Sequence, residues 1–236
     1  MKKWIITCLA FASITICTAF IQPQTAVTGA WSMQDGTNTK ILVIHEGYLS
    51  HTTFDKAAKK FHQTKGGVAT VNGNKLNLKY EFHSAEKDVI GTSEEYTFSV
   101  NNRDLILTKG DNKETWKRVD DNKGALAGVW YISGRMQNGQ IVSRPLAARR
   151  TLKIMSGTRF QWVQVNAEAK ETGATGGGTY TFENGKYTEN IEFFSRDSSR
   201  VGASLTFDGS VNGNVWTHKG LSSRGDPIHE EWTRLR

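Results

Sequence analysis

The residue with the clearest capacity for chemistry in this sequence is a carboxylate on an otherwise apolar strand face. Between residues 186 and 194 apolar and polar side chains alternate, which places Glu189 on the same face as Tyr187 and Ile191. A carboxylate on an inward face must be paired with a cation or protonated. Arg159 is one possible partner. Glu189 is therefore either part of an internal ion pair without function, a group reached by water in a loose interior, or a group that orients a ligand.

A second candidate is a long segment that is rich in arginine. The chain from Trp130 to Leu152 carries no acidic residue and four arginines, namely Arg135, Arg144, Arg149 and Arg150. The planar guanidinium group binds carboxylate and phosphate through two parallel hydrogen bonds. The segment is expected to act either as an electropositive lid over a binding site or as an ordinary solvated loop.

The remaining motifs argue against catalysis. No metal-binding His-Glu-x-x-His sequence or nucleophile elbow is present, and Gly176-Gly177-Gly178 comes before an expected strand rather than a helix, so we expect a bend there. Glu81 and Glu192 alternate outward, which gives no paired carboxylates for acid–base catalysis. We therefore predict a protein that is not an enzyme and has no cofactor.

The histidines do not predict a metal site. Four of the six lie in the first half of the chain, at His45, His51, His62 and His83, and no two have the spacing of paired zinc ligands. His83 also alternates onto the face that we expect to meet solvent. We predict no bound metal.

The start of the chain has the composition of a secretory signal peptide. Lys2 and Lys3 precede an apolar run that extends to Ile21, and small residues follow at positions suited to cleavage. We assign residues 1–26 to this signal, with cleavage after Ala19 or Ala26; an uncleaved anchor is the alternative. The prediction is an exported protein, on the cell surface, in the periplasm or secreted, without stable membrane insertion after cleavage.

Export changes both the cysteine count and the charge. Cys8 and Cys17, the two cysteines of the chain, lie inside the signal, so the cleaved protein has no disulfide. The cleaved protein carries 28 basic and 23 acidic side chains, and the net charge of residues 28–122 is zero. Without a basic stripe interleaved with aromatic residues, the high pI does not predict binding to nucleic acid.

The chain after the expected signal peptide contains an internal repeat of two copies. Residues 66–84 match residues 177–195 at a constant offset of 111, and Glu189 then takes the place of Leu78. Upstream, residues 42–47 align with residues 152–157 at an offset of 110. The repeat predicts two domains, at residues 28–120 and 124–236, joined by a short polar segment.

Each copy has the pattern of an antiparallel β-meander. Apolar residues recur at every second position, and Asn-Gly pairs such as Asn72-Gly73 and Asn184-Gly185 separate the alternating runs. Short helices are expected only at residues 54–61 and 167–172. A domain of this size must remove its edge strands, and closing the sheet into a barrel does so.

Two short motifs carry a resemblance to a known family. Each copy opens with Gly-x-Trp and closes with Glu-x-Trp-x-Arg, which resembles the signature of lipocalin-like (calycin) barrels. The resemblance implies that a first-strand tryptophan closes one end of each barrel and that an arginine of the last strand packs across it. The pairs would be Trp31 with Arg118 and Trp130 with Arg234.

The resemblance is to exported bacterial lipocalin-like proteins of undefined role. The chain differs from secreted animal lipocalins, which have a disulfide, a long C-terminal helix and longer domains, so their ligands are not carried over. The fold class is all-β, with two tandem lipocalin-like meander barrels after an N-terminal signal peptide.

Taken together, these features predict a non-enzymatic exported protein whose second barrel holds a small amphipathic or anionic ligand. The expected tail contacts are Trp162, Tyr187 and Trp216, Glu189 is the expected polar group, and the expected head-group contacts are Arg144, Arg149 and Arg150. The alternative is an envelope-associated interaction module whose solid barrels contact protein or glycan. A cavity of several hundred cubic ångströms favours the first hypothesis.

Overall fold

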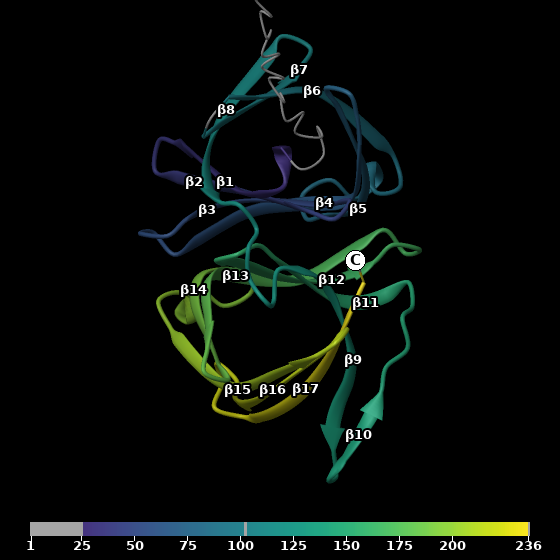
Figure 1. Cartoon of the computed structure of the whole chain (residues 1–236), viewed down its shortest axis with the longest axis vertical. Helices are drawn as coiled ribbons and strands as arrows, with labels where there is room; N and C mark the ends of the chain where they lie inside the picture. Colours follow the sequence, from purple (N-terminus) through teal and green to yellow (C-terminus); the bar gives the residue numbers. More distant parts are fainter. Residues whose placement is uncertain (1–25, 102, 236) are drawn as a thin grey trace, which may run out of the picture.

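The computed structural model describes residues 26–101 and 103–235, and within them the chain forms two barrels that pack against each other (Figure 1). The first barrel contains β1 (Gly29–Asp35), β2 (Asn38–His45), β3 (Tyr48–Asp55), β4 (Lys60–Asn72), β5 (Lys75–His83), β6 (Ser93–Asn101), β7 (Asp104–Lys109) and β8 (Asn112–Asp120), with the short 3-10 helix η1 (Lys87–Val89). Its strands follow one another in antiparallel order, and β8 returns to pair with β1.

The second barrel repeats this order. Its elements are β9 (Gly128–Gln137), β10 (Gln140–Ser143), β11 (Arg149–Met155), β12 (Arg159–Asn166), β13 (Glu171–Glu183), β14 (Lys186–Phe194), η2 (Ser198–Arg200), β15 (Ser204–Asn212), β16 (Val215–Leu221) and β17 (Pro227–Arg234). The barrel closes between β17 and β9, while β10 pairs only with the outer half of β9. The predicted fold class, two antiparallel meander barrels in tandem, is confirmed.

Each barrel is closed at one end by a tryptophan and an arginine. Trp31 donates a hydrogen bond to the Val27 carbonyl at 2.8 Å, and the Arg118 guanidinium lies 3.9 Å from the Trp31 ring. In the second barrel, the Arg234 guanidinium lies 4.2 Å from the Trp130 ring. Both predicted pairs are therefore confirmed. Stacking on an indole and binding backbone carbonyls suit the planar guanidinium group.

The strand register corrects the upstream alignment of the two copies. Trp31 pairs with Leu42 on the neighbouring strand, and Trp130 pairs with Lys153. Lys153 is thus the counterpart of Leu42, and the offset is 111 from this strand through Leu78 and Glu189; the offset of 110 that we inferred for this stretch is wrong. The consequence is that Lys153, like Glu189, takes the place of an inward-facing leucine.

Two local expectations are also corrected. Residues 56–59 and 167–170 form tight turns between strands rather than short helices. The glycine triplet lies inside β13, where the pairing with β14 shifts by one residue between Gly177 and Gly178. A Cβ on Gly178 would lie 1.9 Å from the Asn190 carbonyl oxygen, so the close approach of the two strands requires glycine.

The two barrels pack through equivalent outer faces, β2 to β5 of the first against β11 to β14 of the second. The contact contains a buried apolar cluster of Ala30, Ile41, Val43, Tyr48, Phe54, Phe82, Val129, Leu152, Ile154, Val163, Val165 and Phe193. Within it, the Gln161 amide donates to the Thr64 and Thr175 hydroxyls at 2.8 and 3.0 Å. Buried polar groups that are bonded in this way fix the register of the two faces.

Two glutamates at positions related by the repeat form ion pairs at the border of this contact. Arg150 binds Glu81 at 2.7 Å, and Arg159 binds Glu192 at 2.6 Å. Glu81 and Glu192 do point out of their barrels, but the side chains are only 24% and 14% exposed because the other barrel covers them. Both therefore point outward as expected, but toward the other barrel rather than toward open solvent.

The tryptophan that closes the second barrel should contribute strongly to the stability of the folded protein. Replacing the fully buried Trp130 with alanine (Trp130→Ala) should lower the free energy of unfolding by about 3–5 kcal/mol, because it leaves a large cavity. Val215→Ala, at a position 38% exposed, is the control and should change it by less than about 0.5 kcal/mol. Urea denaturation followed by circular dichroism measures both. A loss below about 1 kcal/mol for Trp130→Ala would mean that this tryptophan does not close the barrel.

Candidate functional site

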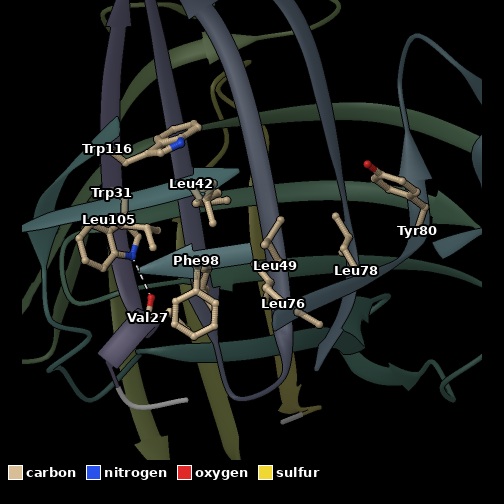
Figure 2. Packing of buried hydrophobic residues seen from close by; sticks show 13 residues of the cluster. Val27, Trp31, Leu42, Leu49, Leu76, Leu78, Tyr80, Phe98, Leu105 and Trp116 are labelled. Carbon is tan, nitrogen blue, oxygen red and sulfur yellow. Dashed lines mark hydrogen bonds between the residues drawn. The ribbon is translucent and has the colours of Figure 1, made fainter. Parts of the chain in front are cut away.

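The interiors of the two barrels differ. Leucines and aromatic rings fill the first barrel, as Figure 2 shows for Leu42, Leu49, Leu76, Leu78 and Trp116. The cavity left there is about 150 Å³, whereas the second barrel holds one of about 480 Å³. Because pockets for small molecules occupy roughly 300–1,000 Å³, the larger of these two interior cavities has the size of a ligand site and the smaller does not.

The cavity of the second barrel has mainly apolar walls and a polar floor. The apolar lining consists of Ile132, Met136, Trp162, Ile191, Phe194, Leu205, Phe207, Ile228 and Trp232. The charged or titratable lining residues include Arg135, Lys153, Glu189, His218 and Glu230. Four of these, all but Arg135, are less than a tenth exposed. An apolar pocket with a few fixed polar groups is the usual form of a small-molecule site.

The first feature of the floor is a buried ion pair. The Lys153 ammonium binds the Glu189 carboxylate at 2.7 Å, and the Tyr187 hydroxyl donates to the same oxygen at 2.8 Å. Glu189 is therefore paired, as expected, but Arg159 is the wrong partner because it binds Glu192.

The ammonium also lies in an aromatic cage. Lys153 Nζ is 4.8 Å from the ring centres of Tyr187 and Trp216 and 5.1 Å from that of Trp232. Attraction between the cation and these ring faces adds to the ion pair. The cage and Glu189 together hold the charged end of Lys153 at the floor of the cavity.

The second feature of the floor is a carboxylate held by several donors. Glu230 accepts hydrogen bonds from His218 Nε2 at 3.1 Å and from Trp232 Nε1 at 3.2 Å, and it binds Arg135. Burial alone would raise the pKa of Glu230, but the hydrogen bond from His218 and the nearby positive charges outweigh it and lower this pKa to about 2. Glu230 is ionised at neutral pH.

His218 is neutral in this arrangement. Burial and the charge of Lys153 lower its pKa below the ordinary value, although Glu230 opposes the shift. Since an ionised carboxylate only accepts hydrogen bonds, the proton of the neutral ring is on Nε2. The Nδ1 atom then has a free lone pair, and it has no hydrogen-bond partner among the described residues.

The structure separates the four residues that we expected inside the second barrel. Trp162 and Glu189 line the cavity. Tyr187 and Trp216 are fully buried beneath the floor, where Lys153 covers their rings. Of these four residues, Trp162 and Glu189 are therefore open to the cavity, and Lys153 separates the other two aromatic residues from it.

The arginine-rich segment forms a hairpin and a neighbouring depression. β9 extends beyond the barrel to pair with β10, and this hairpin projects from the molecule (Figure 1). Arg144, Arg149 and Arg150 lie at a depression that shares Ile132, Thr151 and Gln164 with the cavity. The predicted head-group arginines therefore adjoin the cavity but do not line it.

Two of these arginines are available to an anion. Arg150 is engaged with Glu81 of the first barrel. Arg144 and Arg149 are exposed, as is Arg196 in the same depression, and none of the three forms an ion pair with another described residue. Guanidinium groups without an internal partner are suited to bind a carboxylate or phosphate.

Sequence reasoning missed four cavity residues: Arg135, Lys153, His218 and Glu230. For Lys153 the signal was present, because the correct offset of 111 shows a lysine in the place of Leu42. Arg135 was noted only as part of the arginine-rich segment. His218 and Glu230 lie two residues from Trp216 and Trp232, so strand alternation places them on inward faces, but their meeting depends on the strand pairing.

The first barrel contains histidines that the sequence placed on the surface or left unassigned. His83 is only 6% exposed, so the expectation of a solvent-facing side chain is wrong. His51 packs edge-on against Trp116 at 5.2 Å, and burial lowers its pKa to about 3. Within residues 26–101 and 103–235, no three His, Cys, Asp or Glu side chains are placed to hold a metal ion.

Comparison of the sequence with protein-family models and with curated proteins finds no match. None of the helices in the described part of the chain is long and apolar enough to span a bilayer. The features that bear on function are therefore those of the second barrel itself.

The floor predicts a dependence of stability on pH. The pKa of Glu230 is lower in the folded protein, so its stabilising contribution is complete above about pH 5 and is lost as the pH falls toward 2. The expected loss from this group is roughly 2 kcal/mol between pH 6 and pH 3. Glu230→Gln should lower stability at pH 7 and make the decline below pH 5 less steep.

Urea denaturation at pH 7, 5, 4 and 3 measures this effect. His51→Phe serves as a comparison in the other barrel, because the lowered pKa of His51 makes its own contribution change between about pH 6.5 and 3. If Glu230→Gln and the unaltered protein lose stability equally between pH 5 and 3, Glu230 is not held ionised in the way described.

Proposed function

We propose that this chain is an exported binding protein that carries a small amphipathic ligand in its second barrel. The observation that supports this most is the difference between two copies of one fold. The first interior leaves a cavity of about 150 Å³, while the second holds one of about 480 Å³ with apolar walls and charged groups in fixed positions. A barrel that needed only stability would gain from filling this space, because a cavity of this size is destabilising.

The charges near the cavity favour a ligand with an acidic head group. Arg144, Arg149 and Arg196 border the adjoining depression and have no internal ionic partner. The apolar body of the ligand would lie against Trp162, Phe194 and the other wall residues. Exposed arginines contribute only about 0–1 kcal/mol per ion pair, so apolar contact supplies most of the affinity and the arginines supply orientation and a faster association rate.

The first barrel favours a different role. Its interior is packed, its cavity is about 150 Å³, and its outer face is covered in part by the second barrel. We assign it the role of a support for the second barrel and, where its surface remains open, of an interaction module. The first barrel would then act as the interaction module, and the second barrel would bind the ligand.

The proposal of export rests on the sequence of residues 1–26, of which 1–25 lie outside the described residues. The structure favours one of the two cleavage sites. The Ala26 carbonyl accepts a hydrogen bond from Arg118 at 2.7 Å, and Val27 is fully buried beside Trp31. Cleavage after Ala26 would remove that carbonyl and leave a charged amino group on a buried residue. Cleavage after Ala19 leaves the contacts of Trp31 and Arg118 at the closed end of the barrel intact.

Ligand binding is tested with the cleaved protein and a panel of saturated fatty acids from 8 to 18 carbons. We expect a change in tryptophan emission on titration, because Trp162 lines the cavity and is only half-buried. Leu205→Trp, which fills the cavity from its wall, should abolish binding. No spectral change with any member of the panel would contradict the proposal and favour the interaction module.

The contribution of the arginines is tested separately. The double variant Arg144→Gln with Arg149→Gln should weaken the binding of a fatty acid by about two- to fivefold at low salt and less at high salt. Arg103→Gln, at an exposed arginine of the first barrel, is the matched control and should leave binding unchanged. Equal affinity of the double variant and the control would show that the ligand head does not lie at this depression.

Export is tested by expressing the full chain in a bacterial host and sequencing the protein recovered outside the cytoplasm. The expected first residue is Phe20, which follows Ala19. A first residue of Met1 would refute cleavage, and a first residue of Val27 would refute the argument from the Ala26 carbonyl.

A further inference from the structure

The deep end of the cavity is polar, and this bears on the class of ligand, provided that the proposed function holds. A simple fatty acid that enters with its tail first would place a methyl group against Lys153, Glu189 and His218. All three are less than a tenth exposed and line the cavity. Apolar contact with buried charged groups leaves their remaining hydrogen-bonding capacity unmet, which is unfavourable.

The unmet capacity is specific. Nδ1 of His218 carries a lone pair and has no partner among the described residues, although the ring is 2% exposed. Lys153 has three N–H donors, of which one is used by Glu189. The His218 ring lies 4.9 Å from Trp216, and Lys153 Nζ lies 4.8 Å from the same indole, so both residues pack against one tryptophan beside the cavity.

The Lys153–Glu189 pair has no counterpart at the equivalent positions of the first barrel, although other polar residues, including His51, line the smaller cavity there. Lys153 and Glu189 take the places of Leu42 and Leu78, two leucines that fill the first barrel. A buried ion pair is often no more stabilising than apolar residues of similar volume. Stability therefore does not account for the exchange, whereas recognition of a polar group does.

We propose that the ligand of the second barrel is polar at both ends, with an acidic group at the arginine depression and a hydroxyl group at the floor. The hydroxyl donates to His218 Nδ1 and accepts from Lys153, and the apolar middle of the ligand lies along the cavity wall. The chemical class is a hydroxylated long-chain acid, of which an ω-hydroxy fatty acid is the simplest member.

The test compares dodecanoic acid with 12-hydroxydodecanoic acid on the cleaved full chain by isothermal titration calorimetry. The two probes differ only in the terminal hydroxyl. We expect the hydroxy acid to bind about three- to tenfold more tightly, the range given by one net hydrogen bond. In water the hydroxyl makes a ligand less apolar, so an ordinary apolar cavity would show the opposite preference.

Two variants separate the parts of the floor. His218→Phe removes the free acceptor but keeps a flat ring beside Phe207, from which His218 lies 4.8 Å, and it should remove the preference for the hydroxy acid. Lys153→Leu combined with Glu189→Leu gives the second barrel the leucines of the first, and it should reverse the preference. Lys186→Gln, which breaks an exposed ion pair with Asp208 on the outside of the same barrel, should retain it.

The outcomes distinguish this inference from the function on which it rests. If dodecanoic acid binds as tightly as the hydroxy acid, or if the preference survives in His218→Phe, the polar floor does not recognise the ligand and the inference is overturned while ligand binding stands. If neither acid binds, the proposed function and this inference both fail.

Discussion

The buried ion pair between Lys153 and Glu189 is the constraint on which the difference between the two barrels depends. A buried ammonium and a buried carboxylate cannot be tolerated singly, because removing either one leaves an uncompensated charge in a poorly solvated interior. The pair is placed between strands β11 and β14, on positions that hold leucines in the first barrel. Tyr187, Trp216 and Trp232 surround it, so the floor of the cavity is both charged and rigid.

The contact between the barrels explains how this floor is held in place. Strands β11 to β14 face the cavity on one side and the first barrel on the other, and Leu152, Ile154 and Val163 pack into the apolar cluster between the barrels. Successive side chains of one strand therefore point alternately to the contact and to the cavity. Lys153 lines the cavity, while its neighbours Leu152 and Ile154 lie in the contact. Both faces of these strands are covered. A shift of register by one residue would therefore place the charged side chains in the apolar contact and the apolar side chains in the cavity. The first barrel thus supports the geometry of the second.

Much of the fold could be predicted from the sequence, because its signals are local or repeated. Alternation and Asn-Gly turns define the strands and their order. The Gly-x-Trp and Trp-x-Arg motifs define the residues that close each barrel, and Trp31 and Trp130 lie where these motifs indicate. Residues 54–61 were misjudged because apolar residues at the ends of two strands, Phe54 and Phe61, imitate helical spacing across a tight turn.

The site was predicted only in part. Glu189 and Trp162 follow from alternation, but the partner of Glu189 depends on a register that the offset of 110 obscured. His218 and Glu230 share the inward faces of β16 and β17 with two tryptophans, but alternation alone does not show that the two side chains meet across the strand pair. Nor does the sequence show that Glu81 and Glu192 face a second barrel, because a strand's outer face has the same alternation whether it meets water or protein.

The central claim is that the second barrel is a container and the first is not. The most direct measurement is a crystal structure of the cleaved protein soaked with 12-bromododecanoic acid, with anomalous scattering used to locate the bromine atom. We predict one bromine site inside the second barrel, bordered by Trp162 and other residues of the apolar wall, and none inside the first. A bromine site within the first barrel, or sites only on the outer surface while the second cavity holds no ligand density, would contradict it.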